Sequence, residues 1–363
     1  MQSLDEKSWN EFYLNDIFGF KLAKGDNQPK NMNQGRIPVV SAGETNNGVT
    51  AFVSNPDEGS VFQSGTVTVD MFGKAFWHGY DYCAVSHGRV NILDLNVPNN
   101  SSQFISTCID EGTISKYSYN QMCSQKRLTR QKVMLPVTDS GEPDYEYMAE
   151  YTRQKRDAML DEYRKYVEAR IEELGELVEI PVLGKKEWKP FSIVELFPKI
   201  IPGRGKGLNH LPKVNTGGVN YIGATNRNNG VLCYVEEDDY SRPMILDGNC
   251  IGFIKNGDGS AGFAIYKAEK FISTSDVLYG YADWLNRFTG IFFVTAQDMI
   301  EHKYSHGYKR NKEHLAGDKV MLPIDNSGEP DYAYMEQYAK NMMLRKYQQY
   351  LEFINRQNVA EVE

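Results

Sequence analysis

The sequence contains the same blocks twice in the same order, and this duplication limits the possible folds more than any other feature. Lys132–Met148 (KVMLPVTDSGEPDYEYM) recurs as Lys319–Met335 (KVMLPIDNSGEPDYAYM). Three further pairs of blocks match: WNEFYLNDIF from Trp9 with WKPFSIVELF from Trp188, GETNNGV from Gly43 with GATNRNNGV from Gly223, and KYS from Lys116 with KYS from Lys303. Matching blocks in a fixed order indicate a duplicated unit of about 180 residues.

Each copy combines a β-rich first part with a long helical end. Short β-branched and aromatic runs, interrupted by Gly, Asn and Pro, are typical of strands. A stretch with helical spacing of apolar residues follows, and Pro143 with its acidic neighbours suits a first helical turn. The sequence therefore predicts an α+β fold with two tandem mixed, β-rich domains, each followed by a long α-helix. The predicted boundaries are 1–142 and 187–329 for the domains, 143–178 and 330–357 for the helices, 179–186 for the linker and 358–363 for a tail.

Both predicted helices carry an apolar stripe rich in Tyr and Met. At 1.5 Å per residue the first helix would be about 50 Å long, so its stripe needs a partner surface. We predict that the two helices pair as an antiparallel coiled coil with pseudo-twofold symmetry; the alternative is that each helix packs on its own domain. The residues predicted for helix pairing and partner docking are Met148, Tyr151, Met159, Tyr163, Tyr166, Ile171, Met335, Tyr338, Met342, Tyr347, Leu351 and Ile354.

The composition excludes several classes of protein. No apolar run approaches the ~18 residues of a membrane span, and the N-terminal MQSLDEK has no apolar signal core. The five cysteines are widely spaced, which argues against a disulfide framework and a CxxC zinc site. The net charge is −8, but residues 139–179 contain 13 acidic and 6 basic residues and thus nearly the whole excess. We therefore predict a cytoplasmic protein whose other parts can carry a local basic surface.

No motif predicts catalysis or metal binding. The GxGxxG match at Gly257–Gly262 precedes a β-like run, not the helix that a dinucleotide site requires, so we interpret it as a turn between strands. His302 and His306 lack the glutamate of HExxH, and Asp325 begins no complete calcium loop. We interpret Cys123 as a free thiol. The sequence predicts no catalytic residue, no metal and no cofactor in this chain.

Two basic, tyrosine-containing segments at corresponding places favour DNA binding. They are Lys116–Arg130 (KYSYNQMCSQKRLTR) and His302–Lys312 (HKYSHGYKRNK). Lys and Arg neutralise phosphates, and a protein with two similar halves suits duplex DNA. For any single basic residue, a solvated position is the alternative. The predicted DNA-binding residues are Lys24, Arg36, Asn47, Lys74, His78, Arg89, Lys116, Tyr117, Tyr119, Lys126, Arg127, Arg204, Lys206, Asn229, Lys255, Asn256, Lys303, Tyr304, Lys309 and Arg310.

The duplication also separates two roles. Residues identical in both copies, such as Lys116 with Lys303 and Tyr117 with Tyr304, cannot read two different base sequences, so we expect framework or phosphate contacts. Base recognition is expected where the copies differ. The candidates for it are Lys74, Trp77, His78, His87 and Arg89 in the first copy, and Lys255, Asn256, Asp258 and Ser260 in the second.

The order and duplication of these blocks resemble the DNA-specificity subunit of type I restriction–modification enzymes and of the related type IIB enzymes. The resemblance implies two target-recognition domains, each reading one half of an asymmetric, split DNA site. It also implies that the long helices pair, set the half-site spacing and dock two modification subunits, which are methyltransferases or fused methyltransferase–nucleases. A separate restriction subunit is a further partner in such systems. S-adenosylmethionine and adenine methylation would belong to the partners, since this chain lacks an Asn-Pro-Pro-Tyr segment.

Two alternatives stay open at this point. One is a self-contained DNA-modifying or nuclease enzyme, which metal-dependent cleavage by the purified chain would reveal. The other is a tandem β-rich carbohydrate- or protein-binding module, favoured by the net charge of −8. In that case alanine at Lys116 and Lys303 would leave binding unchanged.

Overall fold

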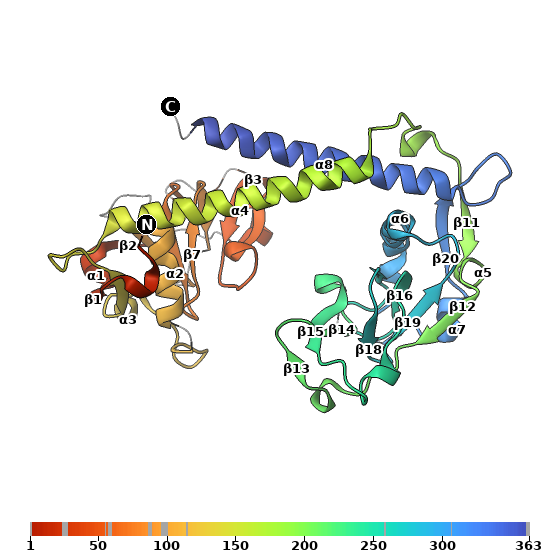
Figure 1. The fold of residues 1–363 in the computed structure, drawn as a ribbon, viewed down its shortest axis with the longest axis horizontal. Coiled ribbons are helices and arrows are strands. Elements are labelled where there is room, and N and C mark those ends of the chain that lie inside the picture. The colour runs from red at the N-terminus through yellow and green to blue at the C-terminus, as the bar shows by residue number, and fades with distance from the viewer. Residues whose placement is uncertain are drawn as a thin grey trace. The chain divides into compact units, whose positions relative to one another are not determined.

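The computed structural model describes residues 2–23, 28–54, 56, 60–85, 89–95, 101–113, 115–257, 259–305 and 307–360, with side chains except at 95 and 356–360. It divides into two compact units, Met1–Arg164 and Lys165–Glu363 (Figure 1). Below, unit 1 and unit 2 are described separately.

Unit 1 contains two four-stranded sheets and a strand pair. The first sheet has the order β2-β9-β6-β7 (Phe18–Leu22, Val90–Leu95, Thr66–Asp70, Ala75–His78). The second has the order β4-β3-β8-β5 (Val49–Val53, Gln34–Val40, Tyr82–Ala84, Val61–Phe62). β1 pairs antiparallel with β10 (Trp9–Tyr13, Lys132–Pro136). The helices are α1, α2, α3 and the first part of α4 (Leu14–Ile17, Ser102–Thr113, Gln125–Leu128, Tyr145–Leu174).

Unit 2 repeats the first sheet and the strand pair of unit 1, whereas its second sheet has its short edge strand on the opposite side. Its first sheet has the order β12-β19-β16-β17 (Lys199–Pro202, Val277–Tyr281, Cys250–Ile254, Ala264–Lys267). The second has the order β13-β15-β14-β18 (Lys213–Val214, Val231–Val235, Val219–Ile222, Phe271–Ser273). β11 pairs with β20 (Trp188–Ser192, Lys319–Pro323). The helices are α5, α6, α7 and α8 (Ile193–Leu196, Arg287–Gln297, Lys312–Ala316, Tyr332–Ala360).

The predicted combination of β-rich domains and long helices is confirmed. The interpretation of Gly257–Gly262 as a turn is also confirmed, because β16 precedes it and β17 follows it. Helices α2 and α6 were not predicted, and neither were the short helices α1, α3, α5 and α7. The start of α6 did have a sequence signal, since the Asn286 side chain accepts from the backbone N–H groups of Phe288 and Thr289 in a capping box.

The long helices begin two residues later than predicted. The side chain of Asp144 accepts a hydrogen bond from the Tyr147 backbone N–H at 3.0 Å, and Asp331 accepts from Tyr334 at 2.9 Å. These aspartates therefore act as N-caps. Pro143 lies outside the helix, in a bridge with Val137, so its assignment to the first helical turn was wrong.

The first turns of both long helices pack on their own β-rich domain. Met148 is fully buried in the core of unit 1, and Met335 is fully buried in the equivalent core of unit 2. Tyr151 and Tyr338 pack against the same cores. These four residues therefore pack on their own domain, which was the alternative to helix pairing. The reason is that an apolar residue at the helix start lies directly above the sheet that leads into the helix.

The last part of α4, from Lys165 onwards, contacts α8 within unit 2. The rings of Tyr166 and Tyr347 are 6.5 Å apart at an interplanar angle of 82°. Further along, the Asn341 side chain donates to the Val178 carbonyl at 2.7 Å and accepts from its N–H at 3.2 Å. Val178 contacts Asn341 and Tyr166 contacts Tyr347, so residue numbers fall along the first segment while they rise along α8. These contacts therefore run antiparallel.

The start of each long helix is held by an equivalent ion pair and cation–π contact. The ammonium of Lys7 lies 2.6 Å from the Asp144 carboxylate, and that of Lys186 lies 2.7 Å from Asp331. Both ammonium groups also lie over a tyrosine ring of the following helix, that of Tyr147 or Tyr334. The aspartate that both copies of the GEPDY block share therefore joins the strand pair, the helix start and the segment before the first strand. Residues 181–186, predicted as linker, contribute to this packing in unit 2 as residues 2–7 do in unit 1.

Candidate nucleic-acid interface

The two basic segments adopt the same local structure. We call Lys116–Arg130 basic loop 1 and His302–Lys312 basic loop 2. In basic loop 1 the backbones of Ser118 and Gln121 exchange hydrogen bonds of 3.3 and 2.9 Å. In basic loop 2 Ser305 and Tyr308 do the same at 3.2 and 3.0 Å. A small hairpin therefore recurs although only the Lys-Tyr-Ser triplet is shared.

Each loop is joined to the central sheet at equivalent points. The Cys123 N–H donates to the Met71 carbonyl at 2.7 Å, and the Arg310 N–H donates to the Lys255 carbonyl at 3.0 Å. Met71 and Lys255 follow the central strands β6 and β16, and their own N–H groups donate to Arg89 and Asp276. In each unit this brings the basic loop, the turn after the central strand and the start of the neighbouring strand to one edge. We call this surface the interface edge.

The tyrosine of the shared triplet fixes the loop on that turn. The ring of Tyr117 lies against Gly73 and that of Tyr304 lies against Gly262, both glycines having a positive φ (+91° and +94°). A Cβ at either glycine would lie within 3 Å of the tyrosine ring, at 2.7 or 2.9 Å. Both tyrosines are therefore framework residues. For positions identical in both copies, either a framework role or a phosphate contact was expected.

Beneath basic loop 2 lies a buried ionic network. The Asp318 carboxylate accepts from Arg310 Nε at 2.8 Å, from Lys303 Nζ at 2.7 Å and from the Tyr304 hydroxyl at 2.7 and 2.8 Å. Arg310 is 0% exposed and also donates to the Gly262 carbonyl and to Gln297. Burial lowers the pKa of Arg310, and the charge of Asp318 opposes this effect. Arg310 and Tyr304 thus support the loop and are wrongly predicted as DNA contacts.

Unit 1 lacks this network. Cys123 takes the place of Arg310 and is buried, and Gln131 takes the place of Asp318. Burial raises the pKa of the Cys123 thiol to about 11 and that of the adjacent Tyr117 hydroxyl to about 12. Both groups therefore stay neutral at physiological pH. The same backbone is supported by apolar packing in one copy and by ion pairs in the other.

The other predicted side chains of both basic loops reach solvent. Lys116, Lys126 and Arg127 are exposed in basic loop 1, and Tyr119 is 74% exposed there. In basic loop 2 Lys309 is exposed, while Lys303 is 43% exposed and keeps its ion pair with Asp318.

Tyr308 was not among the predicted residues. Its ring stacks between those of Tyr304 and His314, with centroid separations of 5.7 and 4.3 Å, and its outer part is exposed. Its place in the small hairpin is the signal that could have identified it, because an aromatic ring there stands at the edge of the loop.

Six further predicted positions adjoin the interface edges. In unit 1, Arg89 is exposed beside Met71, and Lys74 forms a 2.6 Å ion pair with Asp110. In unit 2, the Lys255 ammonium donates to the Ser275 carbonyl at 2.7 Å, with Asn256 next in the chain. The loop that carries Arg204 and Lys206 runs along the same edge, since Gly203 and Gly205 donate to the carbonyls of Val277 and Ser273.

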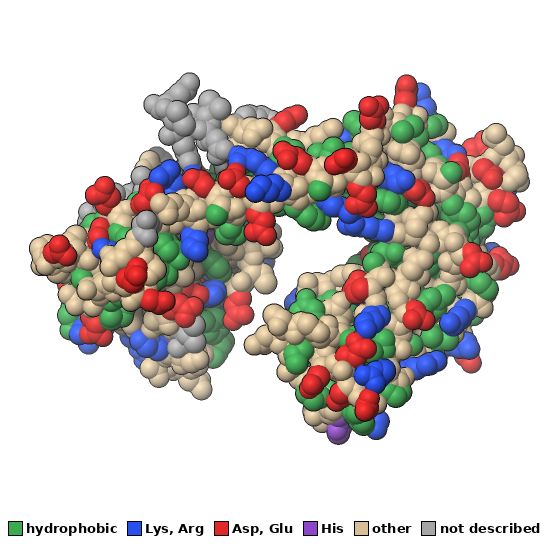
Figure 2. Space-filling view, viewed as in Figure 1, with side chains coloured by type: hydrophobic (Ala, Val, Ile, Leu, Met, Phe, Trp, Pro, Cys, Tyr) green, Lys and Arg blue, Asp and Glu red, His purple; other side chains and the backbone are tan. Residues whose placement is uncertain are grey.

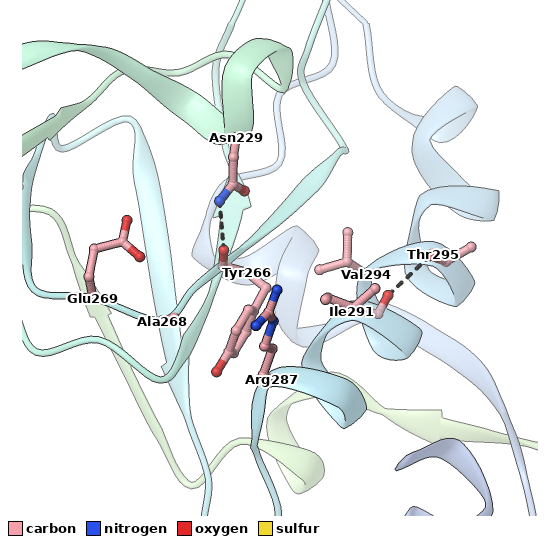
Figure 3. Close-up of a pocket in the computed structure, with 8 residues that line it drawn as sticks. All are labelled: Asn229, Tyr266, Ala268, Glu269, Arg287, Ile291, Val294 and Thr295. Carbon is pink, nitrogen blue, oxygen red and sulfur yellow. Dashed lines mark hydrogen bonds between the residues drawn. The ribbon is translucent and has the colours of Figure 1, made fainter. Parts of the chain in front are cut away.

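Three predicted residues lie elsewhere. Arg36 and Asn47 are on the second sheet of unit 1 and the turn that precedes β4. Asn229 lies at the edge strand β17, where its side chain donates to the Tyr266 carbonyl at 2.9 Å (Figure 3). It lines a pocket of about 460 Å³ with Tyr266, Glu269, Arg287 and one face of α6. Asn229 therefore caps a sheet edge. Lys24, His87, Asp258 and His306 lie outside the described residues.

His78 is in the core of unit 1, so its assignment to DNA binding was wrong. It is fully buried, its Nε2 lies 2.8 Å from the Thr68 hydroxyl, and its ring contacts Tyr82. Burial lowers the pKa of His78 to about 4. At the equivalent position of unit 2, the buried Lys267 pairs with Glu269 at 2.9 Å.

We expect unit 1 to lose stability on acidification because of His78. Its folded-state pKa of about 4 lies below the ordinary value of 6.5. The contribution of the neutral imidazole to the free energy of unfolding is therefore fully present above pH 6.5. About 3 kcal/mol of this free energy is lost as the pH falls towards 4. The melting temperature of His78→Gln should fall less than that of the wild-type chain between pH 7 and pH 4.5. Equal slopes for the two proteins would contradict this assignment.

The basic side chains of the interface edges do not belong to a large, uniformly basic surface in the view of Figure 2. On the face shown in Figure 2, basic and acidic side chains are interspersed on each unit. Within the described ranges, no three His, Cys, Asp or Glu side chains are grouped so that they could hold a metal ion. None of the helices in the described part of the chain is both long and apolar enough to span a membrane. The arrangement offers exposed cations, tyrosines and loop ends, which suit contacts with a phosphate backbone.

Comparisons with known proteins agree with the duplication. The family profile described as "Type I restriction modification DNA specificity domain" matches residues 6–160 and again 185–352. The specificity subunit S.BcgI of the type II restriction enzyme BgcI, from Heyndrickxia coagulans, is 25% identical over 343 residues, covering 92% of this chain and 94% of that protein. The crystal structure of a type I restriction–modification system S subunit from M. genitalium is similar in fold, with a TM-score of 0.50 and 13% identity. That similarity covers 99% of this chain and 96% of the other.

Proposed function

The chain belongs to the family of type I restriction–modification DNA specificity domains, and from this premise we propose that it is a non-catalytic subunit that reads an asymmetric, bipartite DNA sequence. Each unit would bind one half-site through its interface edge. Partner subunits, which would hold S-adenosylmethionine, would methylate adenine and cut the DNA.

The observation that carries the proposal is the recurrence of the interface edge. Two loops with different sequences keep the same hairpin and the same attachment to the central sheet. The residues that fix this geometry, Tyr117 and Tyr304, are identical, whereas the turns beside them differ. A constant frame with variable neighbours is what two readers of different half-sites require.

The exposed side chains would divide the contact with DNA into phosphate contacts and base contacts. Lys116, Lys126 and Arg127 in unit 1 and Lys309 in unit 2 would neutralise phosphates. Arg89 and Asn256, which stand on the turns where the copies differ, are the proposed candidates for base contacts, since Arg suits guanine and Asn suits adenine. The net charge of −8 does not oppose this, because most of the excess lies in residues 139–179.

The long helices would serve as spacer and docking elements. The antiparallel contacts of Tyr166 with Tyr347 and of Val178 with Asn341 support pairing of α4 with α8 as a coiled coil. Because a helix rises 1.5 Å per residue, the pairing would set the distance between half-sites. Two modification subunits would bind the complex.

Selection from a randomised DNA duplex tests the function. The chain, co-expressed with the modification subunit of its own system, is expected to enrich one split sequence with a fixed, unspecified spacer. Exchange of Phe72, Lys74 and Arg89 for other residues, with Gly73 kept, should alter one half of that sequence only. Recovery of an unstructured pool by a correctly assembled complex would refute DNA specificity, and cleavage by the isolated chain would support the enzyme alternative.

A further inference from the structure

The small hairpins of the two basic loops carry different side chains at one equivalent position. The hairpin closes between Ser118 and Gln121 in basic loop 1 and between Ser305 and Tyr308 in basic loop 2. Gln121 and Tyr308 therefore correspond, and both are exposed. Each stands two residues before the backbone N–H that is bound to the turn after the central strand. The position thus lies within the interface edge, at most about 7 Å of chain from its attachment to the central sheet.

A side chain of the short helix that follows each hairpin binds the hairpin from the other end. The Arg127 guanidinium, on α3, donates to the Met122 carbonyl at 2.7 Å. In unit 2, the Nδ1 of His314, on α7, donates to the Lys309 carbonyl at 2.6 Å. Both carbonyls belong to the residue directly after the hairpin. Two different donors therefore make the same contact, which indicates that the placement of the hairpin is kept although the residue type is not.

The Tyr308 ring is held on both faces. It is stacked between Tyr304 and His314, with interplanar angles of 12° and 24°, so that its edge and its hydroxyl point to solvent. At the same place in unit 1, Gln121 presents a side-chain amide. Among the described residues, neither the Tyr308 hydroxyl nor the Gln121 amide has a hydrogen-bond partner. Both copies therefore offer an unpaired polar group from the same point of the same frame.

The two polar groups suit different bases. In the major groove, a glutamine amide can donate to N7 of adenine and accept from its N6 amino group. A tyrosine hydroxyl can donate to O4 of thymine while the edge of the ring packs on the thymine methyl group. A lysine or arginine at both places would instead indicate phosphate contacts. An equal frame with unlike hydrogen-bonding groups is thus suited to unlike half-sites.

We propose that Gln121 and Tyr308 are specificity-determining residues, with Gln121 reading an adenine in one half-site and Tyr308 a thymine in the other. Arg127 and His314 act as positioning residues that hold the hairpins. Since arginine has five N–H donors, this role of Arg127 leaves others for a phosphate. The inference rests on the proposed function, because it names the side chains of the interface edge that select a base, in addition to the turns beside them.

A change of base preference tests the inference. The full chain with Gln121→Arg, co-expressed with the modification subunit of its own system, is put through selection from a randomised duplex. At one position of one half-site guanine should replace adenine, with at least about 10-fold selection against the original base, because arginine suits N7 and O6 of guanine. The spacer and the other half-site should stay unchanged. Tyr308→Gln should place an adenine at one position of that other half-site.

Gln63→Arg is the matched control for the added charge. Gln63 is exposed and precedes β6, so the same substitution stands at the opposite end of this strand from Met71. It should leave both the selected sequence and the slope of log K against log salt unchanged. The positioning role of Arg127 has its own test. Arg127→His copies the contact of unit 2 and should keep the selected base, whereas Arg127→Ala should relax the preference at the position read by Gln121.

The outcomes separate the inference from the proposed function. A Gln121→Arg complex that selects the wild-type sequence would overturn base reading by the hairpin and leave the DNA-specificity proposal intact. The same holds if this complex binds every duplex more tightly and with a steeper salt dependence, since the position would then meet phosphates. A wild-type complex that enriches no split sequence would refute both.

Discussion

Replacing Asp318 by alanine is expected to lower the free energy of unfolding of unit 2 by about 3–5 kcal/mol. The change leaves Arg310 buried with its positive charge and without the carboxylate that balances it. Lys303 and the Tyr304 hydroxyl lose the same partner. Hydrogen exchange in urea, read separately for peptides of unit 1 and unit 2, would show lost protection in unit 2 alone.

The duplicated chain offers a matched control for this experiment. Gln131 is the counterpart of Asp318, is partly exposed and has no buried cation beside it, so Gln131→Ala should change stability by less than about 0.5 kcal/mol. The double variant Arg310→Met with Asp318→Leu removes both charges and should recover most of the loss. If Asp318→Ala were as stable as the wild-type chain, the network would not support basic loop 2.

Neutralising basic loop 1 is expected to weaken DNA binding by the assembled complex about 100-fold at 0.15 M salt. Lys116, Lys126 and Arg127 are exposed, and none of the three forms an ion pair among the described residues. Loss of three phosphate contacts should also reduce the slope of log K against log salt by about 2.7. Fluorescence anisotropy with the selected duplex, between 50 and 300 mM salt, measures both quantities.

A control with the same change in net charge distinguishes local contacts from the overall field. Lys185, Lys189 and Arg345 are exposed in unit 2 and lie away from both basic loops in sequence. Their triple alanine variant should keep the wild-type salt slope. If the two triple variants lose affinity equally, basic loop 1 has no special role in binding.

The two basic segments show where sequence reasoning succeeds and where it stops. Lys309 and Arg310 are adjacent in one basic run, and nothing local distinguishes them. Lys309 is exposed, whereas Arg310 is directed into the core by Asp318, Gln297 and the Gly262 carbonyl. These partners stand 8, 13 and 48 residues away, so the outcome depended on contacts that a reading of the loop could not include.

The same limit explains His78. A histidine on a strand next to Trp77 looks like an exposed contact, yet Thr68 on the paired strand and the Tyr82 ring enclose it. Helix α2 is a different case, because Phe104, Ile105, Cys108 and Ile109 recur at helical spacing and this local signal was missed. What the sequence could not show is its packing, in which Phe104 meets Trp9 and Tyr151 from distant parts of the chain.

The duplication, the α+β class, both long helices and the type of subunit follow from the amino-acid sequence alone, because they depend on repeated blocks and on periodic patterns along the chain. Which cations face solvent and which tyrosines are framework was decided by the tertiary structure. Burial is a property of all the neighbours that a side chain acquires on folding, and most of those neighbours are remote in sequence. Position in a motif therefore predicted the place of a residue on the fold, and tertiary packing decided whether its side chain is available for binding.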